Sequence, residues 1–379
     1  MPVAAGPDAL PPDDSSCTVT SIEKLPTNYE NFVVHPASGL MVVSQPDANG
    51  IYQIYSGIGE ANLRCITCTA ITGGPRVDRH KMMLNIHPSG QWITMGIEED
   101  NHDLWWLPVS WQLGLMQSGV WLNIWITTPT GDRWYQITDY NPANGPADGF
   151  VGVGFANGGT TALWTEIVDG NVLVNKFGVW KLLRADFEVV GGVPTFRNKV
   201  DITPAGAKWI EGGNLHPDGR RLLISTDIGL TDAQGQDQWS LDVVSGELQQ
   251  LTNTPAVWDE HGLYSPDGKK VAFMSSYPYS SDPASYQTLS LKTEFMLMNA
   301  DGTGLQQLTH FNEPGYTESQ PGSTVAAVAG FTEDGTQLLA TVMTADFGKT
   351  NWRIRFAGAC GLRPDRAAVT TGTQPSTSR

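Results

Sequence analysis

Short hydrophobic runs follow polar, glycine-containing turns at regular intervals along this chain. The clearest turns are His216-Pro217-Asp218-Gly219 and Ser265-Pro266-Asp267-Gly268, and the runs after them span residues 221–225 and 270–274. Looser copies of the same turn end at Gly39, Gly90, Gly159 and Gly335. The turn glycines lie about 50 to 70 residues apart, and self-similarity at such a period is the signature of a repeat fold.

Each hydrophobic run begins a longer pattern that predicts a four-stranded unit. In the fifth repeat, alternating residues 295–299 and 305–309 flank Asp301-Gly302, and Asp-Gly between two alternating runs is a strong hairpin signal. The fourth repeat carries the same arrangement in residues 239–243 and 248–252. Six such units predict an all-β fold, a six-bladed β-propeller of four-stranded antiparallel blades.

The two ends of the chain are predicted to close the ring together. The sixth repeat supplies three strands, the last of them at 352–356, whereas residues 17–25 alternate like the missing fourth strand. We therefore expect the N-terminal strand to complete the last blade, which leaves no open sheet edge. Residues 17–362 form one propeller domain in this interpretation. The tails at 1–16 and 363–379 are rich in Pro, Ser, Thr and Ala and are expected to be disordered.

Composition and charge narrow the possible partners. The chain of 379 residues has a net charge of -16 at pH 7. It has no basic stripe to neutralise phosphates, so nucleic acids and anionic membrane surfaces are not expected as partners. Residues 104–131 carry no charge, but they include several polar side chains and lie inside a repeat. They are interpreted as a strand pair with an insertion, so no membrane span is predicted.

The repeats carry a family resemblance. The Pro-Asp-Gly turns after Ser or His, and the run Asn-Ala-Asp-Gly-Thr-Gly-Leu-Gln-Gln-Leu-Thr at 299–309, resemble TolB-like propeller repeats. The match is good in repeats four and five, fair in two and six, and weak in one and three. TolB-like propellers include periplasmic binding proteins, peptidase-associated propellers and some polysaccharide lyases. The resemblance therefore implies the fold and leaves the function open.

The N-terminus and the cysteines bear on location. Residues 1–10 lack the basic start and apolar core of a signal peptide, and they look like a mature N-terminus behind an added Met. In the closed ring, Cys17 and Cys360 lie side by side, which predicts a disulfide. Cys65 and Cys68 are interpreted as a second structural disulfide or as two buried thiols, in preference to a redox or zinc site. An even cysteine count fits an oxidising compartment, so a secreted or periplasmic protein is expected, with its signal segment removed.

The histidines separate into two groups by their place in the repeat. His35, His87 and His216 occupy the first turn position, where Ser265 stands in the fifth repeat. Their expected role is to satisfy backbone groups of the turn. The remaining histidines are expected on the opposite face, where the first strands begin and where the loops between second and third strands lie: His80, His102, His261 and His310.

A set of acidic residues shares one register on that face. Glu30, Glu211 and Glu260 each stand five residues before the first turn residue, which places them at one radius near the central channel. Beside them in the sequence lie further polar residues: Asp259, His261, Arg79 and His80. Carboxylates that converge with imidazoles bind a divalent cation or raise one another's pKa and so create an acid or base. In the alternative interpretation, the glutamates bond backbone amides of the next blade.

Aromatic and acidic loop residues are the remaining candidates. Tyr277, Tyr279 and Tyr286 in the fifth repeat, and Trp105 among the tryptophans of the second, suit a platform for sugar rings. The acidic run at 98–103 lacks the spacing of an EF-hand loop and is interpreted as a solvated loop. No serine-hydrolase elbow, phosphate loop or dinucleotide fingerprint is present, so no nucleotide cofactor is expected.

Two functions fit these observations. The first is an extracytoplasmic lyase or hydrolase that acts on a carbohydrate or similar polyhydroxylated substrate and is assisted by one divalent ion, Ca²⁺, Mn²⁺ or Zn²⁺. Here His80, His261 and Glu260 are metal ligands or catalytic groups, Arg79 holds an anion and Glu211 supports them. The residues expected to contact the substrate are Glu30, His102, Asp259, Tyr277, Tyr279 and Trp105. The second is a non-catalytic scaffold that presents its loop face to a protein or glycan.

Overall fold

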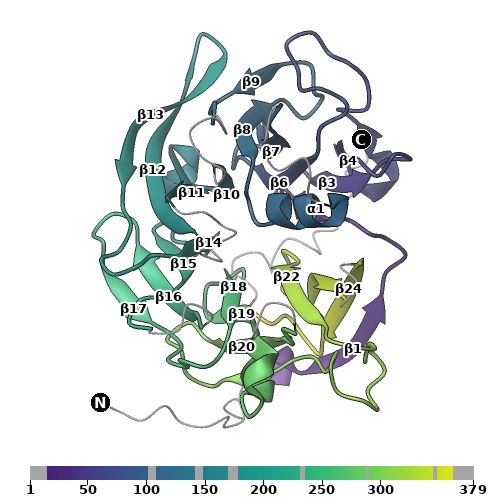
Figure 1. Ribbon diagram of the computed structural model, residues 1–379, viewed down its shortest axis with the longest axis vertical. Helices are drawn as coiled ribbons and strands as arrows, with labels where there is room; N and C mark the ends of the chain where they lie inside the picture. Colours follow the sequence, from purple (N-terminus) through teal and green to yellow (C-terminus); the bar gives the residue numbers. More distant parts are fainter. Residues whose placement is uncertain are drawn as a thin grey trace, which may run out of the picture.

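Six four-stranded antiparallel sheets form a ring in the computed structural model (Figure 1). It describes residues 15–100, 108–140, 148–169, 178–230, 235–286, 290–344 and 348–361. The predicted six-bladed propeller, with its order of turns and strands, is therefore confirmed. The six turn glycines all have φ between 65° and 102°, a region that favours glycine and explains why the repeat is anchored on it.

The strands of blades one to three follow one another in sequence order. Blade one consists of β2 (Asn31–Val34), β3 (Leu40–Pro46), β4 (Tyr52–Ile58) and β5 (Arg64–Cys65). Blade two consists of β6 (Lys81–Ile86), β7 (Ile93–Glu98), β8 (Leu122–Thr127) and β9 (Trp134–Gln136). Blade three consists of β10 (Phe150–Ala156), β11 (Thr161–Asp169), β12 (Val179–Val190) and β13 (Val193–Asp201).

Blades four and five repeat this plan, and blade six departs from it. Blade four consists of β14 (Ile210–Leu215), β15 (Arg221–Thr226), β16 (Asp237–Asp242) and β17 (Leu248–Gln250). Blade five consists of β18 (Asp259–Tyr264), β19 (Lys270–Ser275), β20 (Glu294–Asn299) and β21 (Gln306–Gln307). Blade six consists of β22 (Val325–Phe331), β23 (Gln337–Met343), β24 (Lys349–Phe356) and the N-terminal β1 (Val19–Lys24).

The ring closes as the sequence predicts. Strand β1 pairs antiparallel with β24, with Ile22 opposite Ile354, and Cys17 is bonded to Cys360 just beyond this pair. Cys65 and Cys68 form a second disulfide, so the structural interpretation of that pair is confirmed. Two disulfides are consistent with an oxidising compartment. Residues 15–17 form a short 3₁₀ helix, and the rest of the expected disordered tails lies outside the described residues.

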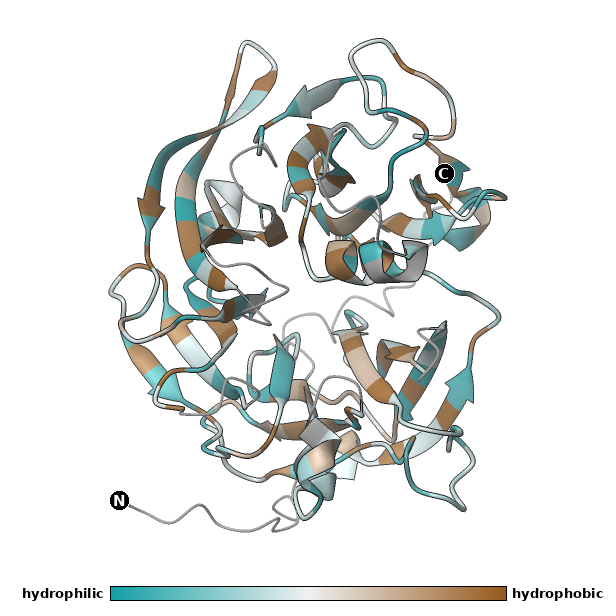
Figure 2. Ribbon diagram, viewed as in Figure 1, coloured by the Kyte–Doolittle hydropathy of each residue, from teal (hydrophilic) through white to brown (hydrophobic). Residues whose placement is uncertain are grey.

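The hydrophobic core is divided among the contacts between blades. Separate clusters of buried side chains join blades one and two, two and three, three and four, four and five, and five and six. Hydrophobic and hydrophilic positions alternate along many of the strands (Figure 2). Alternation places one set of side chains on each face of a sheet, and the blades bury those faces against one another. The first strands of consecutive blades contact one another and surround the axis (Figure 1).

The turn histidines also connect neighbouring blades. The Nε2 atoms of His35, His87 and His216 lie 2.9, 3.0 and 3.2 Å from the carbonyl oxygens of Pro88, Gly159 and Gly268, each on the following blade. A carbonyl oxygen only accepts, so these Nε2 atoms carry the proton. Their Nδ1 atoms face their own turns, as in His87, which accepts the Ser89 backbone N–H at 3.1 Å. The structural interpretation is confirmed, with an added role in holding blades together.

The insertion of blade two differs from the expectation. The sequence predicted a strand pair with an insertion, and the insertion contains a nine-residue helix, α1 (Val109–Gln117), that precedes β8. Its side chains do not show a strong amphipathic pattern, and this is why periodicity did not reveal it. Among the described residues, no helix has the length and apolar character needed to cross a bilayer.

Candidate functional site

A bulge in the first strand of blade five positions the central residue of the site. The pairing of β18 with β19 shifts between Glu260 and Leu263, and His261 within this shift has φ of 54°. The first strands of blades two and three bulge at corresponding places, where Met83 and Gly152 have φ of 56° and 44°. A bulge redirects side chains and often lies beside functional sites. Blade five differs from these two because an imidazole occupies the bulge.

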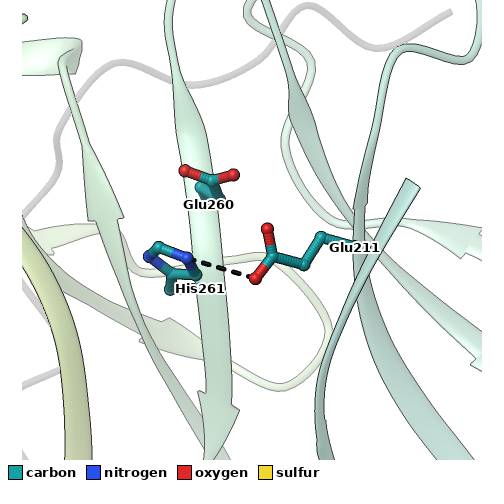
Figure 3. Close-up of side chains that lie close together, drawn as sticks. All are labelled: Glu211, Glu260 and His261. Carbon is teal, nitrogen blue, oxygen red and sulfur yellow. Dashed lines mark ion pairs between the residues drawn. The ribbon is translucent and has the colours of Figure 1, made fainter. Parts of the chain in front are cut away.

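Three ligand-type side chains from two blades meet at this bulge. Glu211 of β14 and Glu260 and His261 of β18 each offer one atom, and these atoms lie within 4.8 Å of one another. His261 Nε2 is 3.3 Å from Glu211 Oε1, an ion pair drawn as a dashed line in Figure 3. We call these three residues the interblade cluster. It contains two of the three glutamates that the register analysis placed at one radius.

The imidazole of His261 is held from both sides. Its Nδ1 lies 2.8 Å from the carbonyl oxygen of Ala327 in β22, so Nδ1 carries a proton and Nε2 faces Glu211. Burial disfavours the charged imidazolium, but the carboxylates of Glu260 and Glu211 outweigh burial and raise the His261 pKa to about 9. The ring therefore joins blades four, five and six and carries a proton on each nitrogen at neutral pH.

Glu260 is the buried acid of the interblade cluster. It is 7% exposed, and the Trp258 indole N–H donates to its Oε2 at 2.7 Å. Burial raises the Glu260 pKa to about 7, with His261 acting in the opposite direction and Glu211 adding to the rise. A carboxyl group that titrates near neutrality beside a paired carboxylate can give or take a proton. The cluster can therefore exchange a proton, or a cation can take the place of that proton.

His80 does not belong to the interblade cluster, which corrects the predicted ligand set of His80, His261 and Glu260. The described residues that come together are Glu211, Glu260 and His261. His80 is 8% exposed, and its Nδ1 accepts the backbone N–H of Tyr52 at 3.2 Å. Burial lowers the His80 pKa, so the ring is held neutral between blades one and two.

Glu30 and Arg79 also lie apart from the cluster. The Glu30 carboxylate pairs with the Lys349 ammonium and accepts a hydrogen bond from the Gln117 amide of α1 at 3.1 Å. Arg79 lines a cleft of blade two and pairs with Asp78 and Asp100, each at 3.4 Å. The expected convergence of three carboxylates is thus met by two of them. The third is neutralised by a lysine that is distant in sequence.

Asp259 and Tyr279 are engaged in internal hydrogen bonds. Asp259 is 1% exposed and accepts from the hydroxyls of Ser275 and Thr254, and burial raises its pKa to about 7. The Tyr279 hydroxyl donates to Glu294 Oε1 at 2.7 Å, while Tyr277 lies half-buried in the same 3₁₀ helix. Both rings remain partly exposed, and the expected sugar platform stays a prediction. His102, Trp105 and the side chain of Tyr286 lie outside the described part of the chain.

Two partners of the interblade cluster were missed by sequence reasoning. Trp258 stands two residues before Glu260, and residues two apart in a strand share a face, so its place beside Glu260 was accessible from the spacing. Ala327 contributes only a backbone carbonyl, and no side-chain signal points to it.

Glu99 is a buried acid of blade two. From the sequence it was interpreted as part of a solvated loop, and the structure corrects this because Glu99 is 4% exposed.

Comparison with known proteins bears on the fold. No protein-family model matches the sequence, and no curated protein matches it significantly. A solved TolB-type protein from Agrobacterium tumefaciens is 15% identical, with a TM-score of 0.49, over 88% of this chain and 91% of the other. TolB from Acinetobacter baumannii is 14% identical, with a TM-score of 0.43, over 88% of this chain and 66% of the other.

A puromycin-hydrolysing peptidase of Mycobacterium tuberculosis is also among the structural neighbours. It is 12% identical, with a TM-score of 0.46, over 88% of this chain and 44% of that peptidase. The chain thus spans most of the Agrobacterium protein but less than half of the peptidase. Likeness at such identities concerns the fold alone. The protein is a six-bladed β-propeller that resembles TolB-like propellers in fold, as its Pro-Asp-Gly repeats predict.

Proposed function

We propose that this protein binds a divalent cation at the interblade cluster and uses the site to hold and act on an acidic, polyhydroxylated ligand outside the cytoplasm. The observation that carries the proposal is the meeting of Glu211, Glu260 and His261 within 4.8 Å. A cation that binds here displaces the proton on His261 Nε2, and the resulting neutral imidazole with two carboxylates suits Zn²⁺ or Mn²⁺ better than Ca²⁺, which prefers oxygen ligands alone. A bound cation would neutralise an acidic ligand group and polarise its oxygen atoms.

The residues around the cluster fit a metal site. Metal-binding histidines usually donate their second ring N–H to a carbonyl or carboxylate, and His261 Nδ1 does so to Ala327. The Trp258 indole N–H orients one oxygen of Glu260 and leaves the other free of that bond. Two carboxylates so close together repel each other unless a proton or a cation lies between them. Burial is the main cause of the raised pKa of Glu260, and repulsion from Glu211 adds to it.

The chain's own groups also support acid–base chemistry at the same place. Glu260 holds a proton near neutrality, and Glu211 is the carboxylate that faces the imidazolium of His261. Such a pair can transfer a proton to or from a ligand that reaches the channel. The net charge of -16 would otherwise repel an acidic ligand, so a cation at this site serves recognition as well.

The first test measures metal binding. Purified protein stripped of metal and titrated with Zn²⁺ or Mn²⁺ in a calorimeter should bind one ion. We expect the double variant Glu211→Gln/His261→Ala to bind on the order of 100-fold more weakly, because two of three ligands are lost. Glu30→Gln is the matched control, since Glu30 has the same register in blade one but pairs with Lys349. Equal affinities of the wild type and the double variant would refute the metal site.

The second test concerns the ligand. The metal-loaded protein is offered acidic oligosaccharides that contain uronate units, and products are followed by reducing ends and by the absorbance of unsaturated uronates. A lyase yields both signals, and a hydrolase yields only the first. We expect turnover that disappears in Glu260→Gln while the fold is retained. Tight binding of oligosaccharide without products, unchanged in Glu260→Gln, would instead identify a non-catalytic scaffold.

A further inference from the structure

A cleft separate from the interblade cluster lies at the loop end of blade two. It has a volume of about 430 Å³ and opens between the connection from blade one and the ends of β7, β8 and β9. A volume of this size accommodates a small organic molecule. Its acidic residues are Glu98, Glu99, Asp100 and Asp139, and its basic residues are Arg76 and Arg79. The interblade cluster shares none of these residues.

Glu99 is the unusual member of the cleft. It is 4% exposed, and neither carboxylate oxygen has a hydrogen-bond partner among the residues that the structure describes. Its backbone N–H donates to the Trp121 carbonyl at 2.9 Å, which fixes its position. A buried carboxylate without a partner is costly, and folded proteins rarely retain one without a reason. Burial, with Asp148 and Asp139 adding to it, raises the Glu99 pKa to about 8.

The positive charges of the cleft are already committed to other acids. Arg76 pairs with Asp78 at 2.7 Å and with Asp100 at 3.4 Å. Arg79 pairs with the same two aspartates, each at 3.4 Å. Asp139 by contrast is exposed at the cleft and has no partner among the described residues. Glu99 and Asp139 are therefore the acidic groups of the cleft that have no partner among the described residues, and Glu99 gains its negative charge as the pH rises through about 8.

The spacing of the acidic side chains in the cleft favours an organic cation over a metal ion. Within the described ranges, the interblade cluster is the group whose three ligand atoms come within 4.8 Å of one another, and the cleft acids form no such group. The cleft is also lined by Trp125 and Tyr140, both half-buried. The Tyr140 hydroxyl donates to Glu166 at 2.7 Å, which holds its ring in place. Aromatic faces attract ammonium and guanidinium groups.

We propose that this cleft binds a small organic cation with a primary ammonium or guanidinium group. The N–H groups of the ligand donate to Asp139, Glu99 supplies a buried counter-charge once it has lost its proton, and the apolar part of the ligand lies against Trp125. Charge assistance makes such hydrogen bonds stronger than neutral ones. The low local dielectric strengthens the contribution of Glu99 relative to an exposed carboxylate.

The test uses putrescine and agmatine as probes, titrated calorimetrically at low salt and about pH 8.5 with a chelator present, so that Glu99, whose pKa is raised to about 8, is mostly ionised. Putrescine carries two ammonium groups and agmatine replaces one with guanidinium, while 1,4-butanediol is the neutral counterpart of putrescine. We expect the two cations to bind and the diol not to bind. Affinity should fall at least tenfold in Glu99→Gln and in Asp139→Asn, whereas His261→Ala should bind the cations as the wild type does.

Glu247→Gln is the matched control, because it removes the same charge at an exposed turn of blade four. It should leave affinity within about twofold of the wild type, as expected for a distant exposed charge. An equal loss in Glu247→Gln and Glu99→Gln would show general attraction to an acidic protein and overturn the proposal. Binding of the diol, or no binding of either cation, would also overturn it. If Glu99→Gln fails to fold, the exposed Asp139→Asn variant still tests the proposal, because an unchanged affinity for both cations in that variant would overturn it.

Discussion

Replacing Cys17 and Cys360 together by serine is expected to lower the free energy of unfolding by about 5 kcal/mol, because this disulfide closes almost the whole chain into one loop. The two cysteines are 343 residues apart in sequence. A crosslink over such a distance removes many conformations of the unfolded chain. Its loss also frees β1 from one of its attachments, and a blade without β1 exposes β24 as an open edge.

The second disulfide provides the control for this prediction. Cys65 and Cys68 are only three residues apart, so replacing both by serine should cost about 2 kcal/mol on the same loop-entropy argument. Urea unfolding of the wild type and the two double variants, followed by tryptophan fluorescence, gives the comparison. Equal losses in both double variants would contradict the argument. So would a Cys17→Ser/Cys360→Ser protein as stable as the wild type.

The second large effect is a pH-dependent gain of stability in Glu99→Gln. Burial raises the Glu99 pKa from its ordinary 4.5 to about 8. The folded state therefore binds the proton more tightly than the unfolded state does. The contribution of the protonated Glu99 to the free energy of unfolding is fully present below about pH 4.5, and it is lost as the pH rises through about 8. Glutamine keeps the shape without the charge and does not suffer this loss.

The expected difference between Glu99→Gln and the wild type is close to zero at pH 4.5. It grows to roughly 5 kcal/mol above pH 8, an order of magnitude set by the size of the pKa shift. Urea unfolding in steps from pH 5 to pH 9 measures it without any ligand. Glu260, whose pKa is raised to about 7, titrates in the same window in both proteins and cancels in the difference. A difference that stays constant with pH, or that also appears in Glu247→Gln, would rule out this account.

Much of the architecture was accessible from the sequence because its signals are local. Alternation of period two marks the strands, and turns such as Ser265-Pro266-Asp267-Gly268 need a glycine at positive φ. Counting three strands in the sixth repeat was enough to assign β1 to it and to pair Cys17 with Cys360. The same register placed Glu211 and Glu260 on facing strands of neighbouring blades, since equivalent positions in a repeat share a radius.

The composition of each site was decided by contacts between blades, which the repeat pattern does not encode. Glu30 shares its register with Glu211 and Glu260, yet Lys349 from the far end of the chain neutralises it. The bulge of β18 aims His261 at Glu211, and Ala327 of blade six fixes the proton on the ring. A bulge and the depth of burial depend on how neighbouring sheets twist and pack. The sequence therefore suggests that Glu99 is a solvated loop acid, and only the packed structure shows it as a buried carboxyl group without a partner among the described residues.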